Sequence, residues 1–238
     1  MTTLTKIIVT SILSLLMLSC VMGKGIKGNG DVISEVRNIP SNFNAIKVSQ
    51  GLDLYITQSN DVSLSVEADS NLHEIIMTEV EDGELRIYTT ENIQTATSRK
   101  IMLSISDITA IKATSGSDVF TTNTLEVKNL KLTCTSGADM SLNVKTEQLS
   151  CETTSGSDIK LRGSTKEFIA KATSGSEIDA SELKTEVSEV NATSGADISV
   201  NVSKELTANA TSGADIRYTG NPEKINASDS SSGSVKKQ

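Results

Sequence analysis

The sequence is poor in the residues that build large-ring cores and common catalytic sites. Its 238 residues include no Trp, three Tyr, three Phe, one His and three Cys. The scarcity of rings argues against a core packed around aromatic side chains. One His and few Cys leave little material for a zinc site or a His-based catalytic triad. The apolar residues, 37% of the chain, are mostly Ile, Leu, Val and Ala, which predicts a thin core of small and branched side chains.

Positive charge is also scarce. The chain has 22 Lys and Arg against 30 Asp and Glu, which gives a formal net charge of −8. A basic surface that would attract nucleic acid is therefore not expected. The length allows one large all-β domain or two small ones.

The N-terminus has the pattern of an export signal. Lys6 precedes an apolar run over residues 7–18, which is too short to span a bilayer as a helix, since that needs about 20 residues. Leu16-Met-Leu-Ser-Cys20 resembles a bacterial lipoprotein processing box, in which the Cys becomes the acylated first residue. We predict an export signal over residues 1–19 and lipidation at Cys20, so that the membrane is contacted only through a lipid anchor. Cleavage after Gly23, giving a soluble exported protein, is the alternative.

A literal G-x-G-x-x-G motif follows, from Gly23 to Gly28. A dinucleotide site needs a strand before this motif and a helix after it. Here the export signal precedes it and Asn29-Gly-Asp31 follows. We interpret residues 20–30 as a flexible tether.

One hexapeptide recurs six times in the second half of the chain. It reads Thr-Ser-Gly, then Ser or Ala, then Asp or Glu, then an apolar residue, and its glycines are Gly116, Gly137, Gly156, Gly175, Gly195 and Gly213. These glycines are 21, 19, 19, 20 and 18 residues apart, and such a period is typical of a solenoid. Positions three and five residues to either side of the glycine are mostly apolar, whereas the position four before it is polar. This alternation predicts half-buried strands on both sides of each glycine.

Each repeat is therefore expected to form one coil of an all-β, single-stranded β-helix (β-solenoid) with about 19–20 residues per coil. One strand enters the Ser-Gly corner, a second strand leaves it, and a polar stretch closes the coil. Equivalent strands should pair in parallel about 4.8 Å apart. This stacking predicts a buried column, each member contributing about 1.5–3 kcal/mol of burial, made of Ile159, Ile178, Ile198 and Ile216.

The corners combine a backbone requirement with a row of charge. A corner between strands often needs a positive φ angle, which Gly adopts without a Cβ penalty, and flanking Ser and Asp can hydrogen-bond the corner as turn residues do. The acids after the corners form a candidate outward ladder: Asp118, Asp139, Asp158, Glu177, Asp197 and Asp215. A calcium ladder is the alternative, although calcium-binding β-rolls carry more Gly and Asp per coil. We expect no metal and no cofactor.

The first half is less regular. Gly51 is flanked by apolar residues at the same offsets, which predicts a further structural corner, and Asp82-Gly83 indicates a hairpin turn. We divide the chain into an irregular N-terminal β portion and cap over residues 31–106, regular coils over 107–235 and a tail over 236–238. Within the coils, Cys134 and Cys151 fall on diagonal inward positions about 8 Å apart. That separation exceeds a disulfide span, so two buried free thiols are expected.

Catalytic chemistry is mostly missing from the sequence. His73 is expected to be a solvated surface residue, and no Ser has a recognisable base partner. Paired carboxylates such as Asp139 and Asp158 could serve glycoside hydrolysis, but no pocket that would separate their pKa values is visible. We therefore expect no catalytic residues and no enzyme.

The order of these segments resembles a known family. Gly28-Asn-Gly-Asp-Val-Ile-Ser-Glu-Val-Arg37, the stretch from Phe43 to Ile56, the Glu79–Ile87 hairpin and the serial corners are similar to the putative auto-transporter adhesin, head GIN domain family. The resemblance covers residues 25–235, with Gln50 replacing the small residue that often precedes the first corner glycine. It implies an exported, right-handed β-helix protein common in Bacteroidetes and brings no catalytic residues.

Two classes of function remain from the sequence. In the first, a cell-envelope protein presents a repetitive β-face to an unknown surface glycan or protein. In the second, it is an envelope structural or sensing module without an external ligand. Both place the chain in the envelope, in the periplasm or at the outer membrane.

Overall fold

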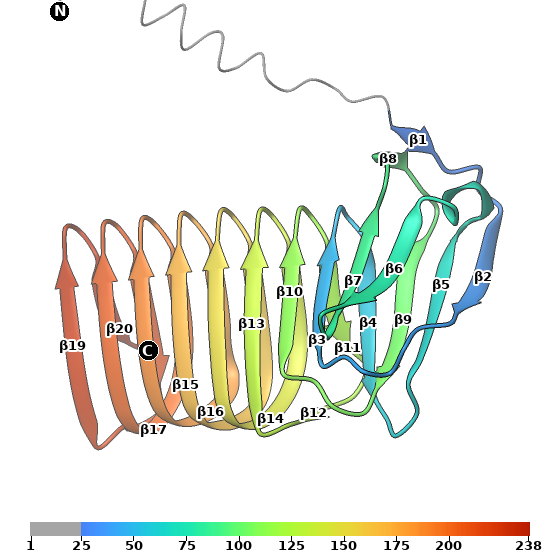
Figure 1. Ribbon diagram of the computed structural model, residues 1–238. Coiled ribbons are helices and arrows are strands. Elements are labelled where there is room, and N and C mark those ends of the chain that lie inside the picture. Colours follow the sequence, from blue (N-terminus) through green and yellow to red (C-terminus); the bar gives the residue numbers. More distant parts are fainter. Residues whose placement is uncertain (1–24) are drawn as a thin grey trace, which may run out of the picture.

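The computed structural model describes residues 25–238, so the predicted export signal and Cys20 lie outside the described residues. The described chain is a row of stacked β coils with an irregular β cap at its N-terminal end (Figure 1). Parallel pairing runs through the row, from the first coil to the last strands of the chain. The β-solenoid predicted from the repeat is therefore confirmed. No helix within residues 25–238 is long and apolar enough to cross a membrane.

The regular coils are built from long strands that run from one Ser-Gly corner to the next. The expected polar closing stretch, such as residues 145–148, remains within a strand instead of forming a loop. Differences in repeat length are absorbed there, as register shifts after Ala180 and after Thr185. The strands of these coils are β13 (Asn129–Thr135), β14 (Asp139–Thr154), β15 (Asp158–Thr173), β16 (Glu177–Thr193) and β17 (Asp197–Thr211).

The interior consists of columns of aliphatic side chains. Ile159 lies opposite Ile178, Ile178 opposite Ile198 and Ile198 opposite Ile216 in the parallel register, and all four are buried. The predicted column is therefore confirmed. Each coil is a single layer of chain. The coils on either side of it are therefore needed to shield its inner side chains from water.

The Gly51 segment forms the first coil, as predicted. Its strands β3 (Ala45–Ser49) and β4 (Asp53–Gln58) pair in parallel with β10 (Ala110–Thr114) and β11 (Asp118–Thr121). The stack is thus continuous across the boundary that we placed at residues 106 and 107. The short strand β12 (Leu125–Glu126) joins β14 in the next coil.

The cap is an insertion within the first coil. Between β4 and β10 the chain leaves the stack, and β7 and β9 return to extend it in parallel beyond β3 and β4. The Asp82-Gly83 turn joins β6 and β7 as predicted. The insertion contains β5 (Ser63–Asp69), a 3₁₀ turn (Ser70–Leu72), β6 (Ile76–Glu81), β7 (Glu84–Thr89), β8 (Ile93–Thr95) and β9 (Arg99–Ile105).

Two segments that we predicted to lie outside the β-structure, the tether and the tail, belong to it in part. The strand β1 (Ile26–Lys27) pairs with β8, and the buried Asp69 carboxylate accepts hydrogen bonds from the backbone N–H groups of Gly30 and Thr97. Residues 25–30 are therefore not a tether, because these contacts hold them against the cap. The next strand, β2 (Val32–Arg37), pairs with β5. The predicted tail at 236–238 is also wrong for Lys236 and Lys237, which belong to β20.

The C-terminal end of the stack is open. It is formed by β18 (Asp215–Thr219), β19 (Lys224–Ser230) and β20 (Ser234–Lys237), and within residues 25–238 no strand covers β19 or β20 from outside. Ile225 continues the Leu206 column but is 47% exposed, and Asp229 continues the column of buried Ala192 and Ala210. A carboxylate in an interior column opposes stacking of another coil, because stacking would bury its charge.

We expect the substitution Asp229→Ala to cause end-to-end association. Alanine would continue the Ala192–Ala210 column and remove the charge that now opposes stacking. Size-exclusion chromatography with light scattering would detect the larger species. Ser228→Ala, which alters the adjacent outward position, should leave the mass unchanged. An Asp229→Ala protein with the wild-type mass at every concentration would show that another feature protects this edge.

Candidate functional site

The repeated corners turn the chain with two successive residues in the left-handed region. In the six Thr-Ser-Gly repeats the glycine φ angles are 64–76° and the serine φ angles are 56–61°. The positive φ predicted for Gly is confirmed, at Gly51 as well. Nothing in the repeat pattern indicated that the serine would share this conformation, which is unfavourable for residues other than Gly, Asn and Asp. Both residues are exposed in all six repeats.

In the six Thr-Ser-Gly repeats the residue after the glycine is small and buried, and the sequence did not indicate this burial. Ser117, Ser157 and Ser176 occupy it in three coils, and their hydroxyl groups donate to the carbonyl oxygen three residues earlier. Ser157 also lies 2.7 Å from the carbonyl oxygen of Cys134 in the neighbouring coil. Hydrogen bonding of the corner by this Ser is therefore confirmed, whereas Ala fills the position in the other three coils by size alone.

The corner at Gly51 explains the unusual Gln50. Gln50 has a φ of 63°, like the serines of the other corners. Its side-chain oxygen accepts a hydrogen bond of 2.9 Å from the backbone N–H of Thr89 at the end of β7. The longer side chain thus fastens the first corner to the cap, where no earlier coil is present to pair with it.

The candidate acidic ladder forms one continuous row along the stack. Parallel register places the six acids opposite one another in sequence order, and Asp53 of the first coil extends the row beyond Asp118. We call these seven residues the acidic row: Asp53, Asp118, Asp139, Asp158, Glu177, Asp197 and Asp215. All of them are at least partly exposed, and neighbours are about 4.8 Å apart across the strands.

The acidic row is poorly neutralised. Among residues 25–238 the only ion pairs to its carboxylates come from Arg217, at 3.3 Å to Asp197 and 3.5 Å to Asp215. Partial burial, and next the Asp158 charge, raise the pKa of Asp139 and of Glu177. None of these carboxylates hydrogen-bonds its own corner in the described chain. The turn role that we predicted for Asp is therefore wrong.

The row alone does not define a metal site. Within residues 25–238, no three or more His, Cys, Asp or Glu side chains are grouped so that they could hold a metal ion. Each coil supplies one row carboxylate at one register position, so the acids extend along a line. Calcium sites need six to eight oxygen ligands around one point.

An aromatic pair lies beside the acidic row. The rings of Tyr55 and Phe120 stack with centroids 5.1 Å apart and an interplanar angle of 25°. Met102, which is 43% exposed, lies opposite Tyr55 on β9. We call Met102, Tyr55 and Phe120 the apolar platform. A chain with six Tyr and Phe residues thus places two of them together on the outside of adjacent coils.

A shallow groove joins the platform to the row. It has a volume of about 340 Å³, and its lining includes Phe120, Asp139, Asp158, Glu177, Lys160 and Asp179. Lys160 lies 3.5 Å from Asp179, and this ion pair is partly exposed. The groove therefore offers an apolar ring at one end and unpaired carboxylates along its length.

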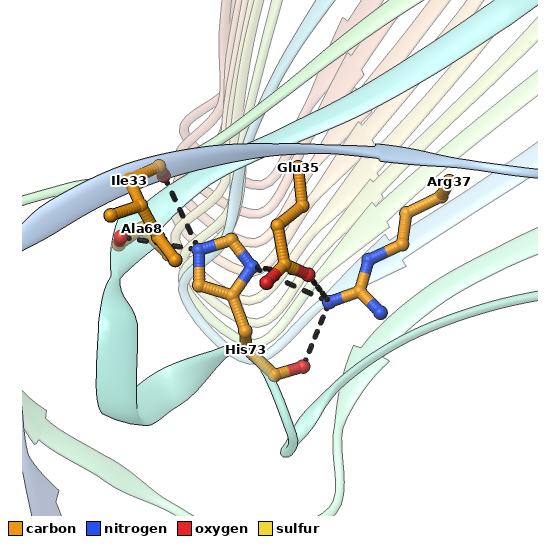
Figure 2. A network of polar contacts seen from close by, with 5 residues as sticks. All are labelled: Ile33, Glu35, Arg37, Ala68 and His73. Atoms are coloured by element: carbon orange, nitrogen blue, oxygen red, sulfur yellow. Dashed lines mark hydrogen bonds and ion pairs between the residues drawn. The ribbon is translucent and has the colours of Figure 1, made fainter.

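His73 is buried, so the prediction of a solvated histidine is wrong. It is 5% exposed, and Figure 2 shows its imidazole enclosed by β2 and the end of β5. Nε2 lies 3.3 Å from the Ile33 carbonyl oxygen and 3.2 Å from that of Ala68, and Nδ1 lies 3.2 Å from the Glu35 carboxylate. Arg37 donates to the His73 carbonyl oxygen at 2.9 Å. The network fastens the edge strand β2 to the cap.

The two described cysteines are buried free thiols, as predicted. Cys134 lies opposite Thr153 and Cys151 opposite Leu132, so the two are diagonal in the register. Burial, and next the Asp139 charge, raise the pKa of Cys134 to about 12. Burial also raises the pKa of the Cys151 thiol. Neither thiol is therefore ionised or reactive near neutral pH.

The fold and this surface define a class: an elongated β-solenoid repeat protein that presents aligned rows of side chains on its outer faces. The chain belongs to the family described as putative auto-transporter adhesin, head GIN domain, whose model matches residues 42–222. Membership of an adhesin family implies an exported or surface protein. A comparison with curated proteins found no match.

Solved structures share the fold. A putative adhesin from Bacteroides fragilis superposes with a TM-score of 0.84 at 20% identity, over 90% of this chain and all of that one. A putative adhesin from Parabacteroides distasonis gives 0.75 at 24% identity, over 90% and 99%. A putative lipid binding protein from the same species gives 0.72 at 23% identity, again over 90% and 99%.

The acidic row should destabilise the fold at neutral pH. Because the folded-state pKa of Asp139 is raised, the protonated form favours folding, and this stability is lost as the pH rises through that pKa. We expect Asp139→Asn to increase the free energy of unfolding at pH 7 by a few tenths to about 1 kcal/mol. The gain should vanish near pH 4 and below.

Urea unfolding at both pH values measures this difference. Asp107→Asn, at an exposed acid outside the row, is the matched control and should change little. A destabilised Asp139→Asn protein at pH 7 would contradict the account, because it would mean that the carboxylate makes a contact on which the fold depends.

Proposed function

We propose that the protein is a non-enzymatic cell-envelope adhesin whose acidic row and apolar platform bind a surface carbohydrate. The observation that carries the proposal is the stacked Tyr55–Phe120 pair at the end of a groove lined by carboxylates. Aromatic rings pack against the apolar face of a sugar ring, and carboxylates accept hydrogen bonds from its hydroxyl groups. The surface combines both groups on rigid strands.

The cost of the row supports a role in binding. Like charges opposite one another on paired strands destabilise a sheet. The corner forms equally well before Asp158 and before Glu177, and neither carboxylate hydrogen-bonds the corner backbone. Residues that reduce stability and make no stabilising contact within the fold are expected at binding sites, where a ligand supplies their contacts.

Binding fits this surface better than hydrolysis does. A glycosidase needs two carboxylates in different environments, so that one is protonated while the other is ionised. Asp139 and Asp158 occupy equivalent positions of successive coils on an open groove. The two carboxylates therefore occupy equivalent structural positions, whereas catalysis would require two different ones.

We expect Phe120→Ala to weaken carbohydrate binding about threefold to tenfold, because a packed ring contributes about 0.5–1.5 kcal/mol. Isothermal titration calorimetry with neutral oligosaccharides would measure the affinity. Ile169→Ala, which removes an exposed apolar side chain outside this groove, is the control. Equal binding by Phe120→Ala and wild type would rule out the platform as the contact.

The proposal includes export and attachment by an acyl group on Cys20. We expect Cys20→Ala to move the protein from the membrane fraction to the soluble exported fraction. Protease added to intact cells should digest the wild-type protein if it is displayed outside. Protection of the protein on intact cells would exclude adhesion as its direct role and would favour the structural or sensing module.

A further inference from the structure

Ion pairs between neighbouring coils follow a regular rule. A cation on one coil faces an acid at or next to the same position of the adjacent coil, which stabilises the stack. Lys145 lies 2.9 Å from Glu126, Lys204 2.6 Å from Glu186 and Lys224 2.6 Å from Glu205. On the sheet that precedes the corners, Lys171 lies 3.8 Å from Glu152.

Three cations on that same sheet break the rule. Lys47 on β3 lies directly opposite Arg86 on β7 and directly opposite Lys112 on β10. These three residues, the cation row, occupy adjacent strands about 4.8 Å apart. Within residues 25–238, neither Lys47 nor Lys112 has an acidic partner within ion-pair distance, and Arg86 pairs only with Glu81. The cation row interrupts a protein whose net charge is −8.

A pocket opens beside the cation row. It has a volume of about 160 Å³ and is lined by Lys47, Ser49, Gln50, Arg86, Ile87 and Tyr88. The lining is polar and basic, with hydroxyl and amide groups next to the two cations. It lies before the first corner, whereas the acidic row lies after it, so the two surfaces are separate.

The guanidinium of Arg86 is held in place before any ligand arrives. Its Nη1 lies 2.7 Å from the Glu81 carboxylate, and its carbon lies 5.7 Å from the centre of the Tyr88 ring. Tyr88 is itself fixed by a hydrogen bond of 3.0 Å to Glu79. A fixed planar guanidinium is suited to oxyanions, because little side-chain entropy is lost on binding.

We propose that this pocket binds a phosphate group through Lys47 and Arg86, while Lys112, one strand beyond Lys47, adds to the positive field from outside the pocket. A planar guanidinium beside an ammonium group suits a phosphate monoester, which carries about −1.5 to −2 charges. The bound anion would relieve the repulsion across β7, β3 and β10. This site goes beyond the proposed carbohydrate function, since it uses a different face and the opposite charge.

Phosphate can come from a sugar phosphate or from a lipid headgroup, so the test uses both. Glucose 1-phosphate and inorganic phosphate are titrated by calorimetry, and vesicles of phosphatidic acid in phosphatidylcholine are compared with phosphatidylcholine alone. Binding to either source supports the site and identifies the carrier. No binding to any of these probes at millimolar phosphate and low salt would overturn the proposal.

The variant Lys47→Gln should weaken phosphate binding about tenfold or more, the loss expected for a charge-assisted hydrogen bond. The matched control is Lys171→Gln, since Lys171 lies on the same sheet with an acidic partner. The control should bind as the wild type does. Equal losses in both variants would show general charge attraction and would overturn a specific site.

Thermal unfolding separates this role from a structural one. Without phosphate, Lys47→Gln should raise Tm by about 1–4 °C, because it removes two like-charge contacts. Phosphate should raise the Tm of the wild type but not of the variant. Should Lys47→Gln fail to fold, Arg86→Gln, which also alters the pocket lining, serves for the binding measurements. A lower Tm for a folded variant, with phosphate binding unchanged, would assign the cations to the fold alone.

Discussion

The parallel register between coils is the constraint on which the rest of the structure depends. Backbone pairing places each residue opposite its counterpart in the next coil, so one choice of residue is repeated along the whole stack. Inside, this produces aliphatic columns that are shielded only by one another. Outside, it produces rows of identical chemistry at the strand spacing, about 4.8 Å. Stability and surface pattern therefore come from the same interaction.

The outward rows show where stability and function diverge. Many cations of the regular coils pair with an acid of the neighbouring coil, which stabilises the stack. The acidic row and the cation row instead place like charges opposite one another, on the two sides of the first corner. Rows of like charge reduce the stability of the fold. We therefore expect ligands to bind at these two rows, with chemistry that complements the charge of each row.

The strand edges at the two ends of the stack are protected from further pairing in different ways. At the N-terminal end an insertion of the first coil adds β7 and β9 to the stack, and the His73 network fastens the edge strand β2 to this cap. At the C-terminal end no strand of the described chain covers β19 and β20, and Asp229 occupies an interior column there. A cap needs many residues, whereas an inward charge needs one.

Three sequence features follow from local spacing alone: the period near 20, the alternation around each glycine and the corner motif. Together they determined the coil, its register, the isoleucine column and the outward acidic row. They could not reveal the left-handed serines, whose backbone strain has no compositional signal. The buried His73, the ordered residues 25–30, the Tyr55–Phe120 pair and the cation row were decided only by the tertiary structure. The surroundings of His73, the order of residues 25–30 and the place of Arg86 depend on the insertion that separates β4 from β10. Tyr55 and Phe120, and Lys47 and Lys112, hold equal offsets from Gly51 and Gly116, but only the structure shows that these two coils stack directly on each other despite the insertion.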